Sequence, residues 1–153
     1  MIEPIKVTVV VNATPDVAFD AFVNDFGTWW PMAPFSMSEG TLTFDAGQGG
    51  QIVETAADGT RHVWGHVTVW QPGKTLAVLW YVGSTPDKAT RVTVEFEQTD
   101  DRRTGVTLTQ DGWEALGDQA LSVRDRNDAG WQTILGAHFV PHANTMEGTT
   151  HHG

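Results

Sequence analysis

The sequence contains no cysteine among its 153 residues. This absence excludes disulfide bonds, catalysis by a thiol and metal sites built from cysteine ligands. A chain of this length fits one domain and can bury a sizeable core without covalent or metal cross-links. We therefore expect a fold that is held together by packing alone.

Long apolar runs are also missing. No stretch approaches the roughly 18 apolar residues that are needed to cross a bilayer. The first residues, MIEPIKVTVV, lack the basic start and the cleavage site of a signal peptide. These absences predict a cytoplasmic protein that does not associate with membranes.

Basic residues are scarce. Nine lysines and arginines stand against nineteen aspartates and glutamates, which gives a formal net charge of −10. Such a charge repels nucleic acid and anionic membranes, so we expect neither as a partner. An acidic surface could meet a basic protein partner, and this alternative stays open.

The N-terminal segment predicts a strand that leads directly into a short helix. Residues 5–12, IKVTVVVN, alternate in polarity, and the predicted buried face consists of Val7, Val9 and Val11. Thr14 is a suitable N-cap, and Pro15 suits the first helical position. The helix then carries an apolar stripe made up of Val17, Ala18, Ala21 and Phe22.

The middle of the chain predicts an antiparallel sheet. Six runs, most with a period of two, follow one another: TLTFDA, QIVETA, HVWGHVTVW, TLAVLWYV, TRVTVEFEQT and GVTLTQDGW. The separators between them are short and rich in turn residues, which indicates hairpins. We predict six antiparallel strands over residues 40–112, joined by the strand at 5–12 along one edge. The GQGG segment at 47–50 has no phosphate-loop lysine and is interpreted as a turn or bulge.

The last predicted element is a helix over residues 128–140. Asn127 or Asp128 can cap it, and Pro141 is expected to end or kink it. Its apolar face consists of Trp131, Ile134, Leu135, His138 and Phe139. A sheet of about seven strands cannot bury its inner face alone, and only this helix offers a long stripe to cover it. The fold class is therefore α+β, with a bent sheet around the C-terminal helix.

Several motifs occur in an order that resembles the START-like (SRPBCC) superfamily. The segments VNATPDVAFDAF and FGTWWP resemble its entry strand and first two helices. The strand block from GQGGQIVETA to TLAVLW, and DGWEALG followed by GWQTILGAHF, resemble its later strands and closing helix. The chain is most similar to the branch named for the activator of heat-shock-protein ATPase, and the resemblance covers residues 3–140.

This resemblance implies the helix-grip (Bet v 1-like) fold with a hydrophobic cavity. Residues 1–142 would form a single START-like domain, and 143–153 would be a flexible tail. The superfamily includes lipid carriers, cyclases, oxygenase subunits and chaperone activators, so it implies no single activity. Because Pro141 would shorten the last helix, the closed end of the cavity could differ from the usual pattern.

Aromatic side chains are the main candidates for contact with a ligand. Seven tryptophans are many for a chain of this length. Trp29, Trp30 and Phe35 follow the first helix, where they could form a lid or mouth. The complete set of candidate ligand-binding residues is Trp29, Trp30, Phe35, Glu54, Trp64, Trp80, Trp113, Trp131, Leu135 and His138.

Candidates for acid–base chemistry are few. Glu54, if it points inward, would have a raised pKa that suits a general acid or base. The favoured interpretation is that Glu54 lies on an edge strand with its carboxylate in water. His138 lies on the buried stripe of the helix, where a structural role is more common. No catalytic arrangement is legible, and no catalytic residue is predicted.

No metal or cofactor is predicted. His62 and His66 would lie about 13 Å apart along a strand, which is too far to share an ion. His138 and His142 have the helical spacing of ligands, but Pro141 lies between them and no acidic residue completes a site. His151 and His152 in the tail are assigned no function.

Three function classes are consistent with these features. The leading hypothesis is a domain that binds a small hydrophobic or amphipathic molecule between the sheet and the C-terminal helix. The alternative is a protein-interaction module like the chaperone activators, and a homodimer is compatible with either. The third is a small cyclase- or hydrolase-like enzyme with Glu54 or His138 as its base.

Overall fold

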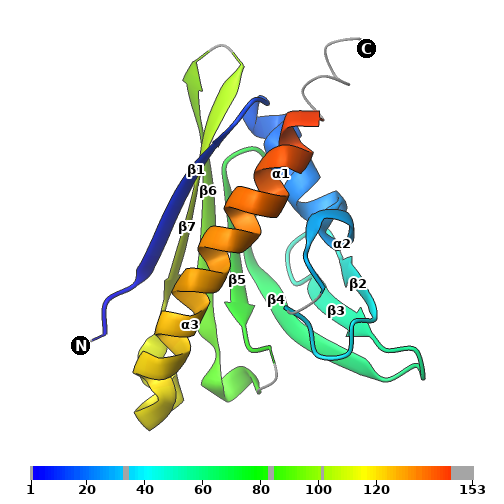
Figure 1. Ribbon diagram of the computed structural model, residues 1–153, viewed down its shortest axis with the longest axis vertical. Helices are drawn as coiled ribbons and strands as arrows, with labels where there is room; N and C mark the ends of the chain where they lie inside the picture. Colours follow the sequence, from blue (N-terminus) through cyan, green and yellow to red (C-terminus); the bar gives the residue numbers. More distant parts are fainter. Residues whose placement is uncertain (1, 33–34, 83–84, 101, 146–153) are drawn as a thin grey trace.

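The computed structural model describes residues 2–32, 35–82, 85–100 and 102–145. A strongly curved sheet surrounds one face of a long C-terminal helix, and two short helices follow the first strand (Figure 1). This arrangement confirms the predicted α+β helix-grip architecture.

The sheet has seven strands: β1 (Ile5–Val11), β2 (Thr41–Phe44), β3 (Gln51–Thr55), β4 (Arg61–Gln71), β5 (Thr75–Trp80), β6 (Thr90–Asp100) and β7 (Arg103–Asp111). Their order is β1-β7-β6-β5-β4-β3-β2, and every neighbouring pair is antiparallel. The six later strands form a meander, as the short separators predicted. Strand β1 joins at the β7 edge, where Ile5 pairs with Gln110.

Helices α1 (Pro15–Asn24) and α2 (Phe26–Trp29) follow β1. Thr14 occupies the N-cap position as predicted, but its side chain makes no capping hydrogen bond. Its backbone carbonyl instead accepts the amide of Ala18 at 2.8 Å, and Pro15 begins the helix with φ already restricted. The buried face of α1 consists of Ala18, Phe19, Ala21, Phe22 and Val23.

The C-terminal helix is longer at both ends than its apolar stripe predicted. After a 3-10 segment, η2 (Trp113–Gln119), helix α3 (Ala120–Thr133) begins well before Asn127. Its first turns, ALSVRDRN, are mostly exposed, and their apolar residues include the exposed Leu121, so they show no continuous apolar stripe. They are held by Arg124, which donates hydrogen bonds to the carbonyls of Glu3 and Pro4.

Pro141 does not end the helix. A π-helical stretch, η3 (Ile134–Phe139), continues α3, and the chain stays helical through Thr145. A proline crowds the carbonyl four residues earlier, here that of Ala137. The wider turns of the π-helical stretch contain this carbonyl and relieve the crowding. Residues 143–145, at the start of the predicted tail, belong to this helix, and 146–153 lie outside the described residues.

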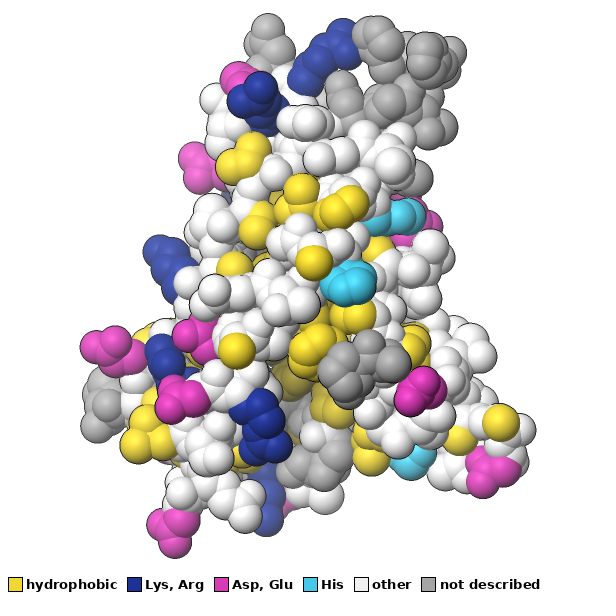
Figure 2. All heavy atoms as spheres, viewed as in Figure 1, with side chains coloured by type: hydrophobic (Ala, Val, Ile, Leu, Met, Phe, Trp, Pro, Cys, Tyr) yellow, Lys and Arg dark blue, Asp and Glu magenta, His cyan; other side chains and the backbone are white. Residues whose placement is uncertain are grey.

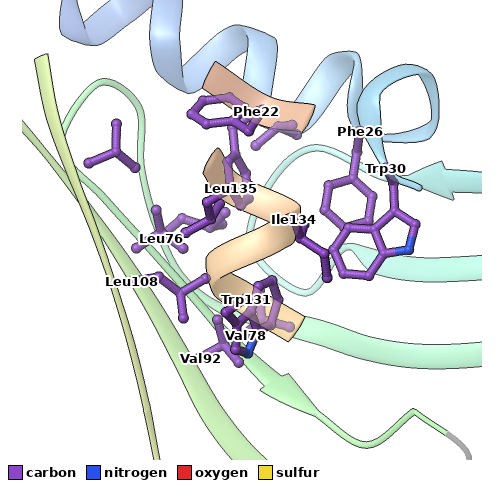
Figure 3. Packing of buried hydrophobic residues seen from close by; sticks show 14 of the residues in the cluster. Phe22, Phe26, Trp30, Leu76, Val78, Val92, Leu108, Trp131, Ile134 and Leu135 are labelled. Atoms are coloured by element: carbon purple, nitrogen blue, oxygen red, sulfur yellow. The ribbon is translucent and has the colours of Figure 1, made fainter. Parts of the chain in front are cut away.

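The core lies between the concave face of the sheet and this helix (Figure 3). Ile134 projects toward Trp30, while Leu135 points toward the strands that carry Leu76 and Leu108. The buried residues of the helix, Trp131, Ile134, Leu135 and Phe139, are each less than 5% exposed, at 3%, 4%, 0% and 0%. The C-terminal helix therefore covers the sheet as predicted. Within the described ranges, no helix is both long and apolar enough to cross a membrane.

Candidate ligand-binding cavity

A cavity of about 570 Å³ lies at one end of the gap between the sheet and α3. Every layer of the fold contributes to its wall. The lining residues are Trp30, Phe35, Ser36, Trp64, Trp80, Tyr81, Val82, Lys88, Thr90, Gln110, Trp113, Leu116, Val123, Arg126, Asn127, Gly130, Trp131 and Ile134. The volume falls within the range of about 300–1,000 Å³ that is typical of small-molecule pockets.

Six of the ten candidate residues line this cavity: Trp30, Phe35, Trp64, Trp80, Trp113 and Trp131. The other four do not. Trp29 is buried among the phenylalanines of α1 and α2, and Leu135 is buried against the sheet. Glu54 lies behind Trp64, and His138 is half-buried on the helix away from the lining.

Four of the lining tryptophans form one cluster. Trp30 lies 5.3 Å from Trp64, 6.0 Å from Trp80 and 5.7 Å from Trp131, measured between ring centroids. Trp80 lies 5.9 Å from Trp64 and 5.3 Å from Trp131. Tilted and edge-to-face pairs at such distances attract one another beyond the burial of their area. The cluster therefore forms a firm apolar wall.

A β-bulge places Trp64 in this wall. In the β3–β4 pairing, Ile52 opposes Gly65 and Val53 opposes Val63, so Trp64 is the extra residue on β4. Bulges redirect a side chain relative to the regular alternation of a strand. The adjacent Gly65 cannot be replaced easily, because a Cβ atom there would lie 2.1 Å from the carbonyl oxygen of Leu79.

Most indole N–H groups around the cavity are already hydrogen-bonded within the protein. Trp30 donates to the carbonyl of Phe35 at 2.7 Å, and Trp64 donates to Glu54 at 3.2 Å. Trp113 and Trp131 both donate to Gln110, at its carbonyl and its side chain. None of these four rings has a free donor for a ligand. Trp30 and Trp131 keep a little exposed carbon surface, at 6% and 3%, whereas Trp64 and Trp113 are fully buried behind the surface of the wall.

One polar group is placed among these rings. Gln110 is fully buried, and its Oε1 accepts the indole N–H of Trp131 at 2.7 Å. Because an indole nitrogen can only donate, this bond fixes the orientation of the amide. Its Nε2 then donates to the hydroxyl of Thr90 at 2.8 Å, and Thr90 donates to the carbonyl of Trp80 at 3.4 Å. The second N–H of Gln110 has no partner within the described residues.

Glu54 is neither an inward-facing carboxyl with a raised pKa nor a carboxylate in water, the two possibilities that the sequence suggested. Its side chain is fully buried, which contradicts a carboxylate in water. It accepts the backbone amides of Met37, Ser38 and Gly40, the Ser38 hydroxyl and the Trp64 indole, all within 3.2 Å. Burial raises the pKa of a carboxyl, but the hydrogen bonds from Ser38, Met37 and Gly40 outweigh it and lower the pKa of Glu54 to about 2.

Glu54 is therefore a positioning residue and no general base. Both of its oxygens are occupied, and it stays ionised at neutral pH. Its bonds hold the backbone at 37–40, directly after the Phe35 and Ser36 that line the cavity. Only the alternation of β3 indicated that this side chain points inward.

The ionisable groups of the cavity wall are two cations and a phenol. Lys88 lies in the short segment η1 (Pro86–Lys88) and Arg126 lies on α3, and both are exposed. Burial raises the pKa of the Tyr81 phenol, whose oxygen lies 3.1 Å from Nδ1 of His66. Among the described lining residues there is no carboxylate and no histidine.

The histidines are not brought together. His142 contacts Asp25 through Nε2 at 2.9 Å and so ties the end of the C-terminal helix to the end of α1. In the part of the chain that the structure describes, no group of three or more metal-ligating side chains occurs. His151 and His152 lie outside the described residues.

Residues 12–141 match the family model described as activator of Hsp90 ATPase homolog 1-like protein. The chain belongs to this family. The match spans most of the chain, from the end of β1 to Pro141, and so includes every residue of the cavity wall. No curated protein matches the sequence of this chain.

Solved structures show what this family member is similar to. An anthrahydroquino-gamma-pyrone synthase, Txn09, solved as a complex with SUM, is 30% identical with a TM-score of 0.59, over 83% of this chain and 88% of that one. CalC, a self-sacrificing resistance protein from Micromonospora echinospora, is 25% identical with a TM-score of 0.67, over 93% and 94%. The Aha1 dimer from Colwellia psychrerythraea, at 20% identity and a TM-score of 0.60 over 89% and 92%, shares the fold.

Several residues of the cavity wall were missed from the sequence. Gln110 could have been found, because Thr104, Val106, Leu108 and Gln110 alternate on one face of β7, and a glutamine at an inward position is unusual. Lys88 and Arg126 lie in segments without periodicity, and nothing in the pattern placed them at a cavity.

Proposed function

We propose that this protein binds a small, largely apolar molecule with a planar ring system in the cavity between the sheet and α3. The observation that carries the proposal is the state of the indoles: four tryptophans line the space while their N–H groups are bonded to the protein itself. Such a wall gains most from apolar and aromatic surface, since ring faces and edges attract other rings.

The buried amide of Gln110 adds a specific polar contact. Its second N–H is a donor without a partner among the described residues, and because the side chain is fully buried, a ligand carbonyl would reach it only after a shift of the rings around it. A ring system that carries a carbonyl matches both features. The name of the Txn09 relative refers to a fused aromatic ring system with a pyrone, which is of this chemical class.

The other two function classes receive less support. Glu54 and His138, the candidate bases of an enzyme, lie outside the cavity wall, and Glu54 is held ionised by five hydrogen bonds. For a chaperone-activator role through the acidic surface, the face shown in Figure 2 offers no direct support, because its described acidic side chains are scattered.

Tryptophan fluorescence tests the proposal. We expect saturable quenching by a neutral ring compound, 9,10-anthraquinone-2-carboxamide, with a dissociation constant of many micromolar or weaker. Burying roughly 300 Å² of apolar surface gains about 7 kcal/mol, and the cost of association removes part of this gain. Asn127→Phe, which adds bulk to the cavity wall on α3, should weaken binding about tenfold, since the ring competes for the same space.

Ser122→Phe is the matched control. Ser122 is exposed on the same helix and is not a lining residue, so this variant should bind like the wild type. Equal binding by both variants would place the probe outside the cavity. A folded wild-type protein that binds no neutral ring compound would contradict the proposal.

A further inference from the structure

We infer that the preferred ligand of this cavity is an anion, with its acidic group between Lys88 and Arg126 and its rings against the tryptophans. The inference rests on the proposed function, and it adds a charge and an orientation to it. It follows from where the few cations of an acidic chain are placed.

The charges of the cavity wall are all of one sign. Lys88 and Arg126 are its only ionised groups at neutral pH among the described lining residues, in a protein whose net charge is −10. Neither side chain lies within ion-pair distance of a described carboxylate, although Lys88 interacts electrostatically with the adjacent, exposed Asp87. In contrast, Arg91, Arg103 and Arg124, which lie outside the cavity, each contact an aspartate. The two cations of the cavity therefore remain available to a ligand.

The two cations come from different parts of the fold. Arg126 lies on α3, on the same face as the lining residues Val123, Asn127 and Gly130. Lys88 ends the η1 segment between β5 and β6, two residues before the buried Thr90. Both side chains are exposed, whereas Trp64, Trp113 and Gln110 are fully buried. The cavity thus has two exposed cations at its mouth, and its buried part consists of aromatic rings with the Gln110 amide and the Thr90 hydroxyl.

This gradient orients a ligand. An apolar ring system gains from the buried end, while a carboxylate or phenolate must keep contact with water or cations to avoid the cost of desolvation. At the mouth, the acidic group of a ligand can contact both water and the two cations. Guanidinium and ammonium groups donate charge-assisted hydrogen bonds to carboxylate and phenolate oxygens. A small aromatic acid, with a carbonyl for Gln110, fits the whole cavity.

Two probes of nearly equal shape test the charge separately from the rings: 9,10-anthraquinone-2-carboxylate and its neutral 2-carboxamide. We expect the double variant Lys88→Gln with Arg126→Gln to weaken binding of the carboxylate about fivefold, because each partly exposed ion pair contributes a factor of a few. Binding of the carboxamide should change less than twofold. Titration by tryptophan quenching at low ionic strength measures both.

The control is Lys74→Gln with Arg61→Gln. Both residues are exposed and lie outside the cavity wall, and the control changes the net charge by the same amount. The control variant should bind the carboxylate and the carboxamide as tightly as the wild type does. Because both double variants have the same net charge, long-range repulsion of the carboxylate by the acidic protein is the same in the two. Thermal unfolding of each variant confirms that it is folded.

The outcomes separate the inference from the proposed function. If both probes bind and the carboxylate is weakened only by loss of Lys88 and Arg126, the inference holds. If both probes bind but the carboxylate is unaffected, or both probes weaken equally, the inference is overturned and the proposed function stands. If neither probe binds the folded wild-type protein, the proposed function fails and the inference fails with it.

Discussion

Lowering the pH from 5 to 2 is expected to reduce the free energy of unfolding by about 3 kcal/mol through Glu54 alone. The pKa of this carboxyl is about 2 in the folded protein, against an ordinary value of 4.5. A carboxyl with a lowered pKa in the folded state stabilises the fold above the unfolded pKa. That contribution is lost as the pH falls from about 4.5 through about 2, because the unfolded chain takes up the proton first.

The physical origin of this term is the ring of donors around the carboxylate. Met37, Ser38 and Gly40 present three backbone amides to it, and no other acceptor for these amides is seen among the described residues. Protonation replaces an acceptor by a donor at a site where every partner except the Ser38 hydroxyl can only donate. The same reasoning predicts that Glu54→Gln destabilises the protein at pH 7 by about 3 kcal/mol, since its amide group faces these N–H groups.

Urea denaturation of the wild type and Glu54→Gln at pH 7, 5, 3 and 2 measures both effects. The difference between the two proteins should be largest at pH 5–7 and should shrink toward pH 2, which isolates Glu54 from the other carboxylates. Glu95→Gln, at an exposed position of β6, is the control and should change stability by less than about 0.5 kcal/mol. A difference that stays constant with pH would show that Glu54 is not ionised in the folded state.

The sheet and its strand order could be predicted because each strand has its own recognisable local sequence pattern. The period-two runs and the short separators PGK and DG specify hairpins, and consecutive hairpins generate the meander without further information. The position of β1 at an edge followed from the need to place one remaining strand, but the sequence did not indicate that this edge is β7. The same locality explains why Ile134 and Leu135 were recognised as the buried face of the closing helix.

The cavity wall was predictable only in part, because it depends on contacts between distant segments. Six aromatic residues of the wall were identified by their residue type. Trp29 is also aromatic and Leu135 is also apolar, but both are core residues, so residue type alone does not separate the wall from the core. The role of Glu54 depends on a loop that turns its amides inward, with Glu39 at a φ of 53°. No periodicity encodes such a loop. The first turns of α3 were missed because a helix fixed by Arg124 needs no apolar stripe.

Replacing Trp131 by alanine is expected to lower the free energy of unfolding by about 3–4 kcal/mol. The indole is 3% exposed and contacts Trp30 and Trp80, so its removal takes away a large part of the contact between helix and sheet. The loss should stay below the upper limit for a tryptophan, because the ring also lines the cavity and water can fill the space that it leaves. A loss below about 1 kcal/mol would show that the helix is not the main cover of the sheet.

A double-mutant cycle separates packing from the hydrogen bond between Trp131 and Gln110. Trp131→Phe keeps most of the aromatic contact but leaves Oε1 of Gln110 without its donor, which should cost about 1–2 kcal/mol. Gln110→Leu removes the acceptor of the Trp131 indole N–H and also the donor to the Thr90 hydroxyl. In the double variant neither side of the Trp131–Gln110 bond remains, so its loss should be smaller than the sum of the single losses by about 1 kcal/mol. Additive losses would mean that water already satisfies these groups, and the cavity would then be wet at the amide that we assign to a ligand carbonyl.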